Sequence, residues 1–254
     1  MAFNCADFYD AELKWHNDHL RAAARIEAHH CVLDIGCGAG QTAREAAHIA
    51  VKGSVLGIDV SAQMLEIARQ RSTEQGLRNV TFEQGDAQRY AFPPASFDLC
   101  ISRFGAMFFA DPTSAFTNIR KSMRLGGRLV WMVWQSQDRN QWATAIRQAL
   151  ASEKTTPAAA MAAFSLGEPA TTAGLLKAAG FTSIDFAEVQ EPVFYGPDVN
   201  CAYDALIGLQ FSGTGAASDG AKLRLRELLG AHLTAQGVLF NSRTWLVTAQ
   251  CATN

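Results

Sequence analysis

Three closely spaced glycines are the most informative residues of the chain. Gly36, Gly38 and Gly40 follow an apolar run, rich in β-branched residues, that begins at Cys31, and helix-forming residues come next. This order predicts a strand, a tight loop and the start of a helix. Glycine lacks a Cβ atom, so a ligand can press against the main chain, and the helix start presents unpaired N–H groups. The loop can therefore hold a polar cofactor.

Three carboxylates accompany this loop. Asp34 lies inside the apolar strand, where an unpartnered carboxylate would be costly to bury, so we expect it to anchor the loop or a ligand ammonium group. Asp59 and Asp86 come at the ends of the next two predicted strands. Open α/β sheets bind ligands at the carboxyl ends of their strands. An ammonium, a ribose diol and an adenine amino group would need three acceptors of this kind.

A dinucleotide site fits the loop less well. The pattern G-x-G-x-x-G requires a third glycine that lets the helix pack closely beneath a pyrophosphate. Counted from Gly36 and Gly38, that position is Gln41. The spacing therefore weakens a nicotinamide-dependent interpretation.

The elements that must position these residues alternate between strand and helix signals, which predicts an α/β fold with a doubly wound, mostly parallel sheet. After the first unit, strands are expected at 54–60, 80–86, 97–104, 127–135, 182–189 and 244–250. Helices are expected at 61–75, 112–124, 141–150, 171–179, 201–211 and 221–235. One domain is expected over 1–254, with an N-terminal cap (1–30), a cofactor-binding core (31–135), and a helical cover and insertion at about 136–180 and 190–240.

The composition limits the classes of molecule that the protein is expected to bind. The chain has 254 residues, of which 48% are hydrophobic, and 22 basic against 24 acidic residues give a net charge of -2. No basic field indicates nucleic acid or anionic lipid, so a small-molecule substrate is expected. No leader or membrane-length apolar run is present, which favours a cytoplasmic protein. The six cysteines form no C-x-x-C pattern, so we expect free thiols and no metal site. The sequence carries no pattern that indicates an oligomeric state.

Five segments together resemble the class I S-adenosylmethionine-dependent methyltransferases, of the small-molecule type grouped with the ubiquinone and menaquinone biosynthetic enzymes. They are VLDIGCGAG (32–40), GIDVS (57–61), GDA (85–87), FPPASFDLCISRFGAMFF (92–109) and RLGGRLVWMVW (124–134). The resemblance implies a Rossmann-like seven-stranded sheet with helices on both faces and an antiparallel last strand near Trp245. It also implies S-adenosylmethionine as the cofactor.

The resemblance also implies roles for particular residues. Gly36 and Gly38 would approach the amino acid part of the cofactor, and Asp59 would hold both ribose hydroxyls. The full expected cofactor-binding set is Asp34, Gly36, Cys37, Gly38, Gln41, Asp59, Val60, Met64, Gly85, Asp86, Ala87 and Arg103. Within it, Asp86 and the Ala87 N–H would read the adenine, and Met64 would pack on the adenine face. In the alternative, Asp59 caps the helix near Ser61, Asp86 makes a turn, Met64 is core and Cys37 is a small spacer.

Methyl transfer from a sulfonium needs a general base only when the acceptor must lose a proton. His16 and His19, in KWHNDHLRAA, are the candidates, because in this family the N-terminal segment folds over the cofactor. Our hypothesis is that His19 faces the acceptor, while the alternative is a structural hydrogen bond. Arg103 either recognises an anionic acceptor or pairs with an acid such as Asp111.

A flat or lipophilic acceptor is suggested by an apolar, aromatic-rich set made of Phe104, Met107, Phe108, Phe109, Trp134 and Trp142. Two further classes remain open. One is a noncatalytic or repurposed protein that binds the same cofactor, and the other is a nicotinamide-dependent oxidoreductase. A thiol-dependent arsenite methyltransferase is disfavoured because Cys31 and Cys37 sit on or beside the buried first strand.

Overall fold

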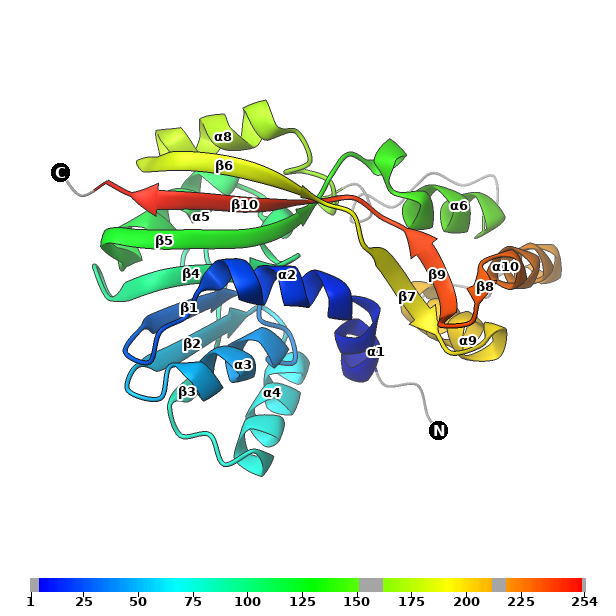
Figure 1. Ribbon diagram of the computed structural model, residues 1–254, viewed down its shortest axis with the longest axis horizontal. Helices are drawn as coiled ribbons and strands as arrows, with labels where there is room; N and C mark the ends of the chain where they lie inside the picture. Colours follow the sequence, from blue (N-terminus) through cyan, green and yellow to red (C-terminus); the bar gives the residue numbers. More distant parts are fainter. Residues whose placement is uncertain (1–4, 151–161, 212–217, 253–254) are drawn as a thin grey trace.

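A twisted seven-stranded sheet forms the centre of the protein (Figure 1). The computed structural model describes residues 5–150, 162–211 and 218–252. The strands of this sheet are β1 (Cys31–Ile35), β2 (Ser54–Asp59), β3 (Val80–Gln84), β4 (Phe97–Arg103), β5 (Met123–Trp134), β6 (Phe181–Val189) and β10 (Thr244–Cys251). Their order is β3-β2-β1-β4-β5-β10-β6, and β10 pairs antiparallel with both β5 and β6. The predicted seven-stranded, mostly parallel sheet with an antiparallel last strand is confirmed.

Helices cover both faces of this sheet. They are α2 (Lys14–Ala24), α3 (Gln41–Ile49), α4 (Ala62–Glu74), α5 (Pro112–Ser122) and α8 (Pro169–Ala178). In Figure 1, α2 and α3 lie in front of the sheet and α5 lies behind it, packed against α8. The helix starts follow local sequence: the Ser61 hydroxyl accepts a hydrogen bond from Met64 N, and the Asp111 carboxylate accepts one from Ser114 N.

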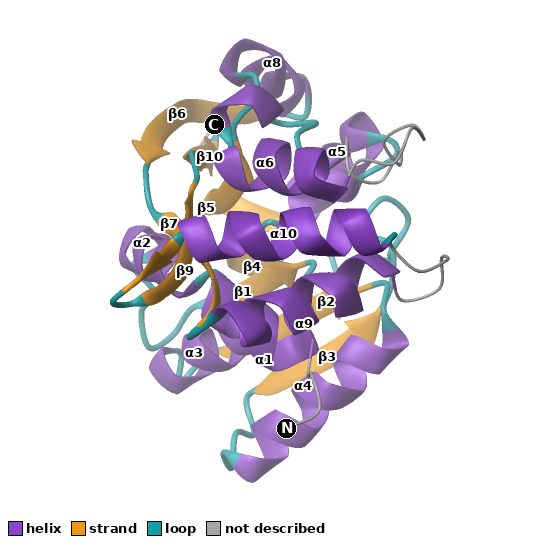
Figure 2. Ribbon diagram, turned by 90° about the vertical axis from the view of Figure 1, so that its right-hand side faces the viewer, coloured by secondary structure: helices purple, strands orange, loops and turns teal. Residues whose placement is uncertain are grey.

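The remaining elements gather beyond the carboxyl ends of the parallel strands, the end that faces the viewer in Figure 2. They comprise α1 (Cys5–Glu12), α6 (Gln141–Leu150), α9 (Val199–Phe211), α10 (Asp219–Ala231), and the three-residue turns η1 (Ala106–Phe108) and η2 (Gln137–Arg139). A second sheet of order β7-β9-β8 joins them, formed by β7 (Pro192–Gly196), β8 (Leu233–Thr234) and β9 (Gly237–Asn241). This sheet was not predicted.

Several predicted boundaries were wrong by a few residues. β5 begins at Met123, four residues before the predicted 127, and β3 ends at Gln84, so that Gly85 and Asp86 lie in a loop. Phe104 follows β4 rather than belonging to it. Part of the predicted helical cover, residues 151–161, lies outside the described residues.

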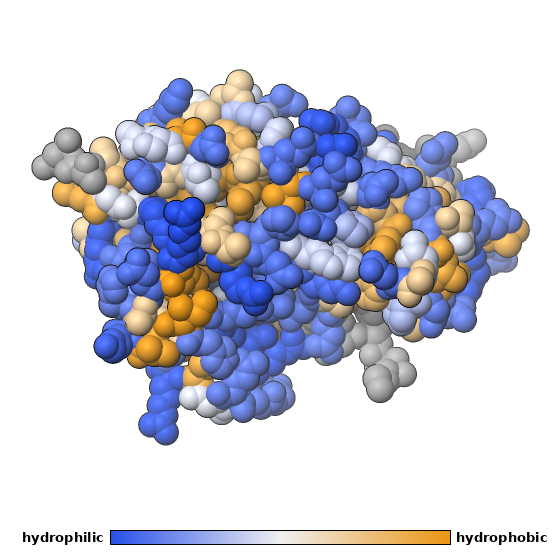
Figure 3. Space-filling model, in the orientation of Figure 1, coloured by the Kyte–Doolittle hydropathy of each residue, from blue (hydrophilic) through white to orange (hydrophobic). Residues whose placement is uncertain are grey.

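The core is continuous and apolar, with Trp131, Phe116, Leu33 and Leu99 fully buried around the middle of the sheet. On the face shown in Figure 3, hydrophilic side chains dominate and the apolar patches are small and separate. Among the described residues, no helix is both long enough and apolar enough to cross a membrane. The described cysteines, Cys31, Cys37, Cys100, Cys201 and Cys251, are free thiols, as predicted.

Candidate functional site

The surroundings of the three glycines in the first loop differ, so glycine is needed at each position for a different reason. Gly36 (φ 66°) touches the backbone after β4, because a Cβ there would lie 2.6 Å from Gly105 Cα. Gly40 (φ 78°) packs against α4 and β3, where a Cβ would lie 2.8 Å from Ala68 and from Phe82. Gly38 (φ 53°) has no atom within 4 Å of a built Cβ. The loop is therefore closed at Gly36 and Gly40 and open at Gly38, where a ligand can approach the main chain.

Asp59 holds this open position from the end of β2. Its Oδ2 accepts a hydrogen bond of 2.8 Å from Gly38 N, and its Oδ1 accepts one of 2.8 Å from Ser61 N. Ser61, not Asp59, supplies the side-chain cap of α4. Asp59 thus links the glycine loop to the next helix start, with a half-buried carboxylate beside the open position.

Asp34 is completely buried within β1. Thr42 Oγ1 donates a 2.5 Å hydrogen bond to its Oδ2, while Oδ1 has no hydrogen-bond partner among the described residues. Burial raises the pKa of Asp34 to about 7, although the bond from Thr42 and the charge of Arg103 oppose this rise. An orphaned carboxylate oxygen beneath the loop is a vacant acceptor for an ammonium or other donor.

The loop after β3 brings Gly85, Asp86 and Ala87 to the same edge of the sheet. Gln88 donates from its backbone N to Asp86 Oδ1 at 2.9 Å and from its side chain to both carboxylate oxygens. A Cβ on Gly85 would lie 2.4 Å from the Tyr90 ring, so glycine is required there for packing. Asp86 therefore organises a turn, as the alternative interpretation predicted, and its contact with a ligand stays a prediction.

The other predicted cofactor-binding residues differ in exposure. Val60 is 69% exposed and Met64 is half-buried at the start of α4. The Cys37 side chain packs beneath the loop against Gly57, and burial raises the pKa of its thiol. This favours the spacer interpretation of Cys37. Gln41, at the start of α3, bonds to Glu45 and Arg103.

Arg103 ties the N-terminal helix across the site. Its Nη1 donates a 2.6 Å hydrogen bond to Gln41 Oε1, and its Nη2 lies 3.2 Å from Asp10 Oδ1 on α1. The other oxygen of Asp10 pairs with Arg71 on α4 at 3.1 Å. The acid that pairs with Arg103 is therefore Asp10, and the predicted alternative Asp111 was wrong, because that carboxylate caps α5 instead.

The two candidate histidines are three residues apart on α2 and differ in burial. The His19 side chain is 45% exposed, and its Nε2 lies 2.8 Å from Glu191 Oε1. This placement does not favour the hypothesis that His19 faces the acceptor. His16 is fully buried, and its Nε2 lies 2.9 Å from Ser242 Oγ.

A row of aromatic rings continues from His16 beyond the ends of β4 and β5. Phe104 stacks on Trp134 with ring centroids 4.1 Å apart, and Trp134 is followed by Trp142 at 5.1 Å and Phe164 at 5.9 Å from Trp142. Phe104 has φ 59°, a left-handed conformation that is rare for a bulky residue and that clusters at functional sites. We refer to Phe104, Trp134, Trp142 and Phe164 as the aromatic row.

Two polar residues near this site were missed by the sequence reasoning. Glu12, at the end of α1, bonds to Tyr195, and burial raises its pKa to about 8 while the charge of Arg103 opposes the rise. Ser242 contacts His16 across 226 positions of sequence. An isolated Glu or Ser in a polar segment carries no sequence signal, so only the fold reveals them.

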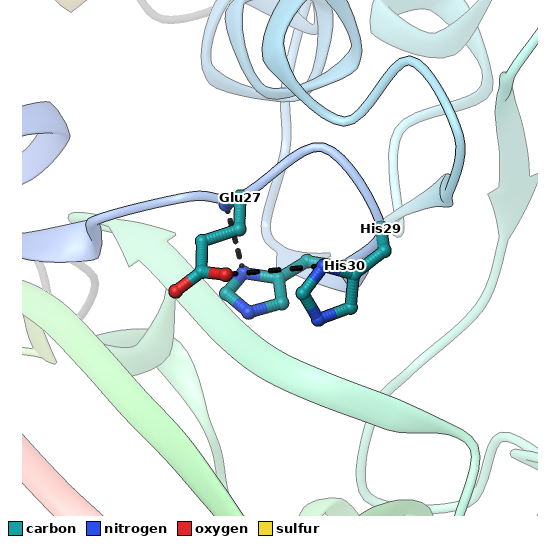
Figure 4. A group of neighbouring side chains, drawn as sticks. All are labelled: Glu27, His29 and His30. Carbon is teal, nitrogen blue, oxygen red and sulfur yellow. Dashed lines mark hydrogen bonds and ion pairs between the residues drawn. The ribbon is translucent and has the colours of Figure 1, made fainter.

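A separate polar cluster lies on the turn between α2 and β1 (Figure 4). Glu27, His29 and His30 bring their potential ligand atoms within 4.8 Å of one another. His30 Nδ1 already accepts a 3.0 Å hydrogen bond from Glu27 N. Since this turn precedes β1, it lies at the opposite end of the sheet from the glycine loop and is not part of the site above.

Comparisons with known proteins identify the region that carries this geometry. Residues 32–127 match a family model described as a methyltransferase domain. A demethylmenaquinone methyltransferase from Deinococcus radiodurans is 40% identical over 111 residues, which are 43% of this chain and 46% of that protein. Nocamycin O-methyltransferase from Saccharothrix syringae is 31% identical over 166 residues, 60% of this chain and 59% of that protein. The chain thus spans about half the length of the curated relatives that it matches.

A solved structure extends the comparison over nearly the whole fold. The YcgJ protein from Bacillus subtilis superposes with a TM-score of 0.67, covering 94% of this chain and 100% of that chain at 21% identity. At this identity the likeness concerns the fold alone. The match therefore supports the overall fold, and the chemistry is argued from the site residues.

Proposed function

We propose that this protein, whose residues 32–127 form a methyltransferase domain as its motifs predicted, transfers a methyl group from S-adenosylmethionine to a small organic acceptor. The single observation that carries the proposal is the open backbone at Gly38, flanked by the Asp59 carboxylate, inside that domain. The reaction is of the general class of one-carbon transfers to a nucleophilic atom.

The residues present fit this cofactor in two respects. S-adenosylmethionine has an ammonium group, and the buried Asp34 has one carboxylate oxygen without a partner among the described residues. The cofactor must also approach the main chain closely, and Gly38 leaves space for it where another residue would have a side chain. A dinucleotide fits less well, because Gln41 at the start of α3 stands where the dinucleotide pattern has its third glycine.

Each site residue then has a defined task. Asp59 would accept from the ribose hydroxyls, and the Asp34 carboxylate would accept from the ammonium. The guanidinium of Arg103 has N–H groups beyond those given to Gln41 and Asp10, and one of them would donate a charge-assisted hydrogen bond to the cofactor carboxylate. Asp86 and the Ala87 N–H would contact the adenine, and Met64 would pack against its face.

When bound, S-adenosylmethionine supplies a methyl group on a positively charged sulfur. The protein itself contributes positioning. Asp10 ties α1 to Arg71 and Arg103 across the site, and the stacked rings of Phe104 and Trp134 form an apolar wall beyond β4 and β5. Holding acceptor and methyl in line accounts for most of the acceleration that such a reaction needs.

The acceptor class follows from charge and surface. The net charge of -2 does not favour nucleic acid, and the aromatic row favours a flat, apolar molecule. The names of the two relatives point the same way, since both describe methyltransferases of small organic compounds. Location in the cytoplasm stays a prediction.

The test is an incubation with methyl-labelled S-adenosylmethionine and a fractionated cell extract. The proposal predicts label in one small-molecule fraction, lost in Asp59→Ala and retained in Asp111→Asn, whose carboxylate caps α5 through Ser114 and bonds to none of the residues expected to hold the cofactor. Label in protein or nucleic acid would contradict the acceptor class. Tight cofactor binding without label in any fraction would favour a repurposed binding protein.

A further inference from the structure

A buried nitrogen without a partner lies beside the aromatic rings that follow the ends of β4 and β5. His16 is 0% exposed, and its Nδ1 has no hydrogen-bond partner among the described residues. A buried polar atom left unpaired destabilises the folded protein, so such an atom in a native structure calls for an explanation. A ligand that completes its hydrogen bonding is one such explanation.

The hydrogen-bond network fixes the protonation of this imidazole. Ser242 Oγ donates its hydrogen to Glu191 O at 2.7 Å, so toward His16 the hydroxyl oxygen can only accept. The 2.9 Å contact between His16 Nε2 and Ser242 Oγ therefore places the proton of the neutral ring on Nε2. Nδ1 is left with a free lone pair, which accepts a hydrogen bond and cannot donate one.

Aromatic rings surround His16. Its ring lies edge-on to Phe104 at 5.7 Å and to Trp134 at 5.5 Å. Phe104 stands between Arg103, which bonds to Gln41 at the start of α3, and Gly105, whose backbone touches Gly36 in the glycine loop. His16 therefore packs against Phe104 and Trp134. Phe104 lies at the point where the end of β4 touches the glycine loop.

The aromatic row leads from this point toward solvent. Phe104 and Trp134 are buried, whereas Trp142 and Phe164 are only half-buried. A flat molecule that parts these rings would lie against aromatic faces and meet one hydrogen-bond acceptor at the inner end. Such a site favours a planar molecule with a donor group and rejects one without it, because the acceptor would remain unpaired.

We propose that His16 Nδ1 receives the hydroxyl hydrogen of a planar acceptor, so that this protein methylates oxygen on a phenol or enol. This inference rests on the proposed function. In the step, the hydroxyl oxygen forms the new bond to the methyl carbon, and the carbon–sulfur bond breaks with its electron pair returning to sulfur. The hydroxyl proton passes to Nδ1 and later leaves to solvent.

The basicity of His16 suits a proton transfer that accompanies methyl transfer. Burial, with the nearby charges of His19 and Arg103, lowers the pKa of His16 to about 3. A phenol, with a pKa of about 10, is not ionised by such a base beforehand. The same oxygen becomes strongly acidic once it is bonded to the methyl carbon, and the imidazole then accepts its proton.

The first experiment uses matched probes in the presence of S-adenosylhomocysteine. 1-Naphthol and 2-naphthol, which are un-ionised near neutral pH, are each compared with their methyl ethers by calorimetry, on the wild type, His16→Phe and His29→Phe. Phenylalanine keeps a ring edge-on to Phe104 and Trp134, and His29 is an exposed histidine at the opposite end of the sheet. We expect at least one hydroxyl probe to bind about tenfold more tightly than its ether to the wild type and His29→Phe, and no such preference in His16→Phe.

Nitrogen-15 spectra of the histidines provide a second readout that a merely structural role would not move. The Nδ1 resonance of His16 should shift when the hydroxyl probe binds and stay in place with the ether. Ser242→Ala, which removes the group that fixes the tautomer, should mix the two neutral forms and reduce the preference for the hydroxyl probe. This variant also tests the proposal should His16→Phe fail to fold.

Equal binding of hydroxyl probes and ethers by the wild type would overturn the inference, and so would a preference that persists in His16→Phe. Binding of S-adenosylhomocysteine without binding of any probe would overturn it too, while leaving the proposed function standing. Failure of S-adenosylhomocysteine itself to bind would instead refute the proposed function.

Discussion

Exchanging single glycines in the first loop separates binding from folding. Gly38→Ala adds a Cβ that meets no protein atom within 4 Å, so its cost to folding comes only from the left-handed backbone at φ 53°. That strain is about 1–2 kcal/mol for an alanine, which for a chain of this size lowers the Tm by roughly 2–8 °C. The added methyl group would stand where the cofactor approaches the main chain.

For Gly38→Ala we expect a substantial loss of cofactor affinity beside the modest loss of folding stability. A Cβ that crowds a close contact costs typically 1–3 kcal/mol, which corresponds to roughly 5- to 150-fold in Kd. Gly40→Ala is the matched control. It carries the same backbone strain at φ 78° and places a Cβ 2.8 Å from both Ala68 and Phe82, so its main cost should fall on folding.

Isothermal titration calorimetry with S-adenosylmethionine and thermal unfolding of the free protein measure the two effects. We expect Gly38→Ala to be the weaker binder and Gly40→Ala to have the lower Tm. If Gly38→Ala bound the cofactor within threefold of the wild type, about 0.6 kcal/mol, the assignment of the open backbone to the cofactor would be refuted.

Three further predictions concern pH and the α1 tether. Because burial lowers the folded-state pKa of His16 from 6.5 to about 3, unfolding takes up a proton in this window, so the free energy of unfolding should fall by up to roughly 5 kcal/mol as the pH drops from 6.5 to 3. Urea titrations should show a flatter dependence for His16→Phe, and an equally steep one would contradict this. Because the pKa of Asp34 is raised to about 7, cofactor affinity should weaken as pH falls below 7 in the wild type and much less in Asp34→Asn, measured by calorimetry. Arg103→Ala, which loses Asp10 and Gln41, should speed amide exchange in α1 and weaken cofactor binding about tenfold, whereas Arg124→Ala, paired with Asp98, should do neither.

The main sheet was predictable because its signals are local. β1 is a buried apolar run closed by Gly36, and helix starts such as that of α4 carry their own capping residue, Ser61. The second sheet was not predictable, since β7 and β9 are five-residue runs whose partners lie far apart in the chain. Short apolar runs of this kind do not distinguish strand from helix or loop.

The candidate site was predicted in part for the same reason. Asp34, Gly38 and Asp59 belong to recognisable motifs, and the structure brings them together at one edge of the sheet. The choice between His16 and His19 depends on which of the two side chains is buried, and that is decided by Ser242 and Trp134 from distant segments. The left-handed backbone of Phe104 likewise follows from tertiary packing, because no residue type at that position signals it.

The most direct test of the account is whether S-adenosylmethionine binds at the edge marked by Asp59. Calorimetry on the wild type, Asp59→Ala and Asp111→Asn measures this, because the loss of two charge-assisted hydrogen bonds should weaken binding about 100-fold or more only in Asp59→Ala. We predict tight binding by the wild type and by Asp111→Asn, and a loss confined to Asp59→Ala. Equal affinity of all three proteins, or no binding by any of them, would contradict the assignment of this edge as the cofactor site.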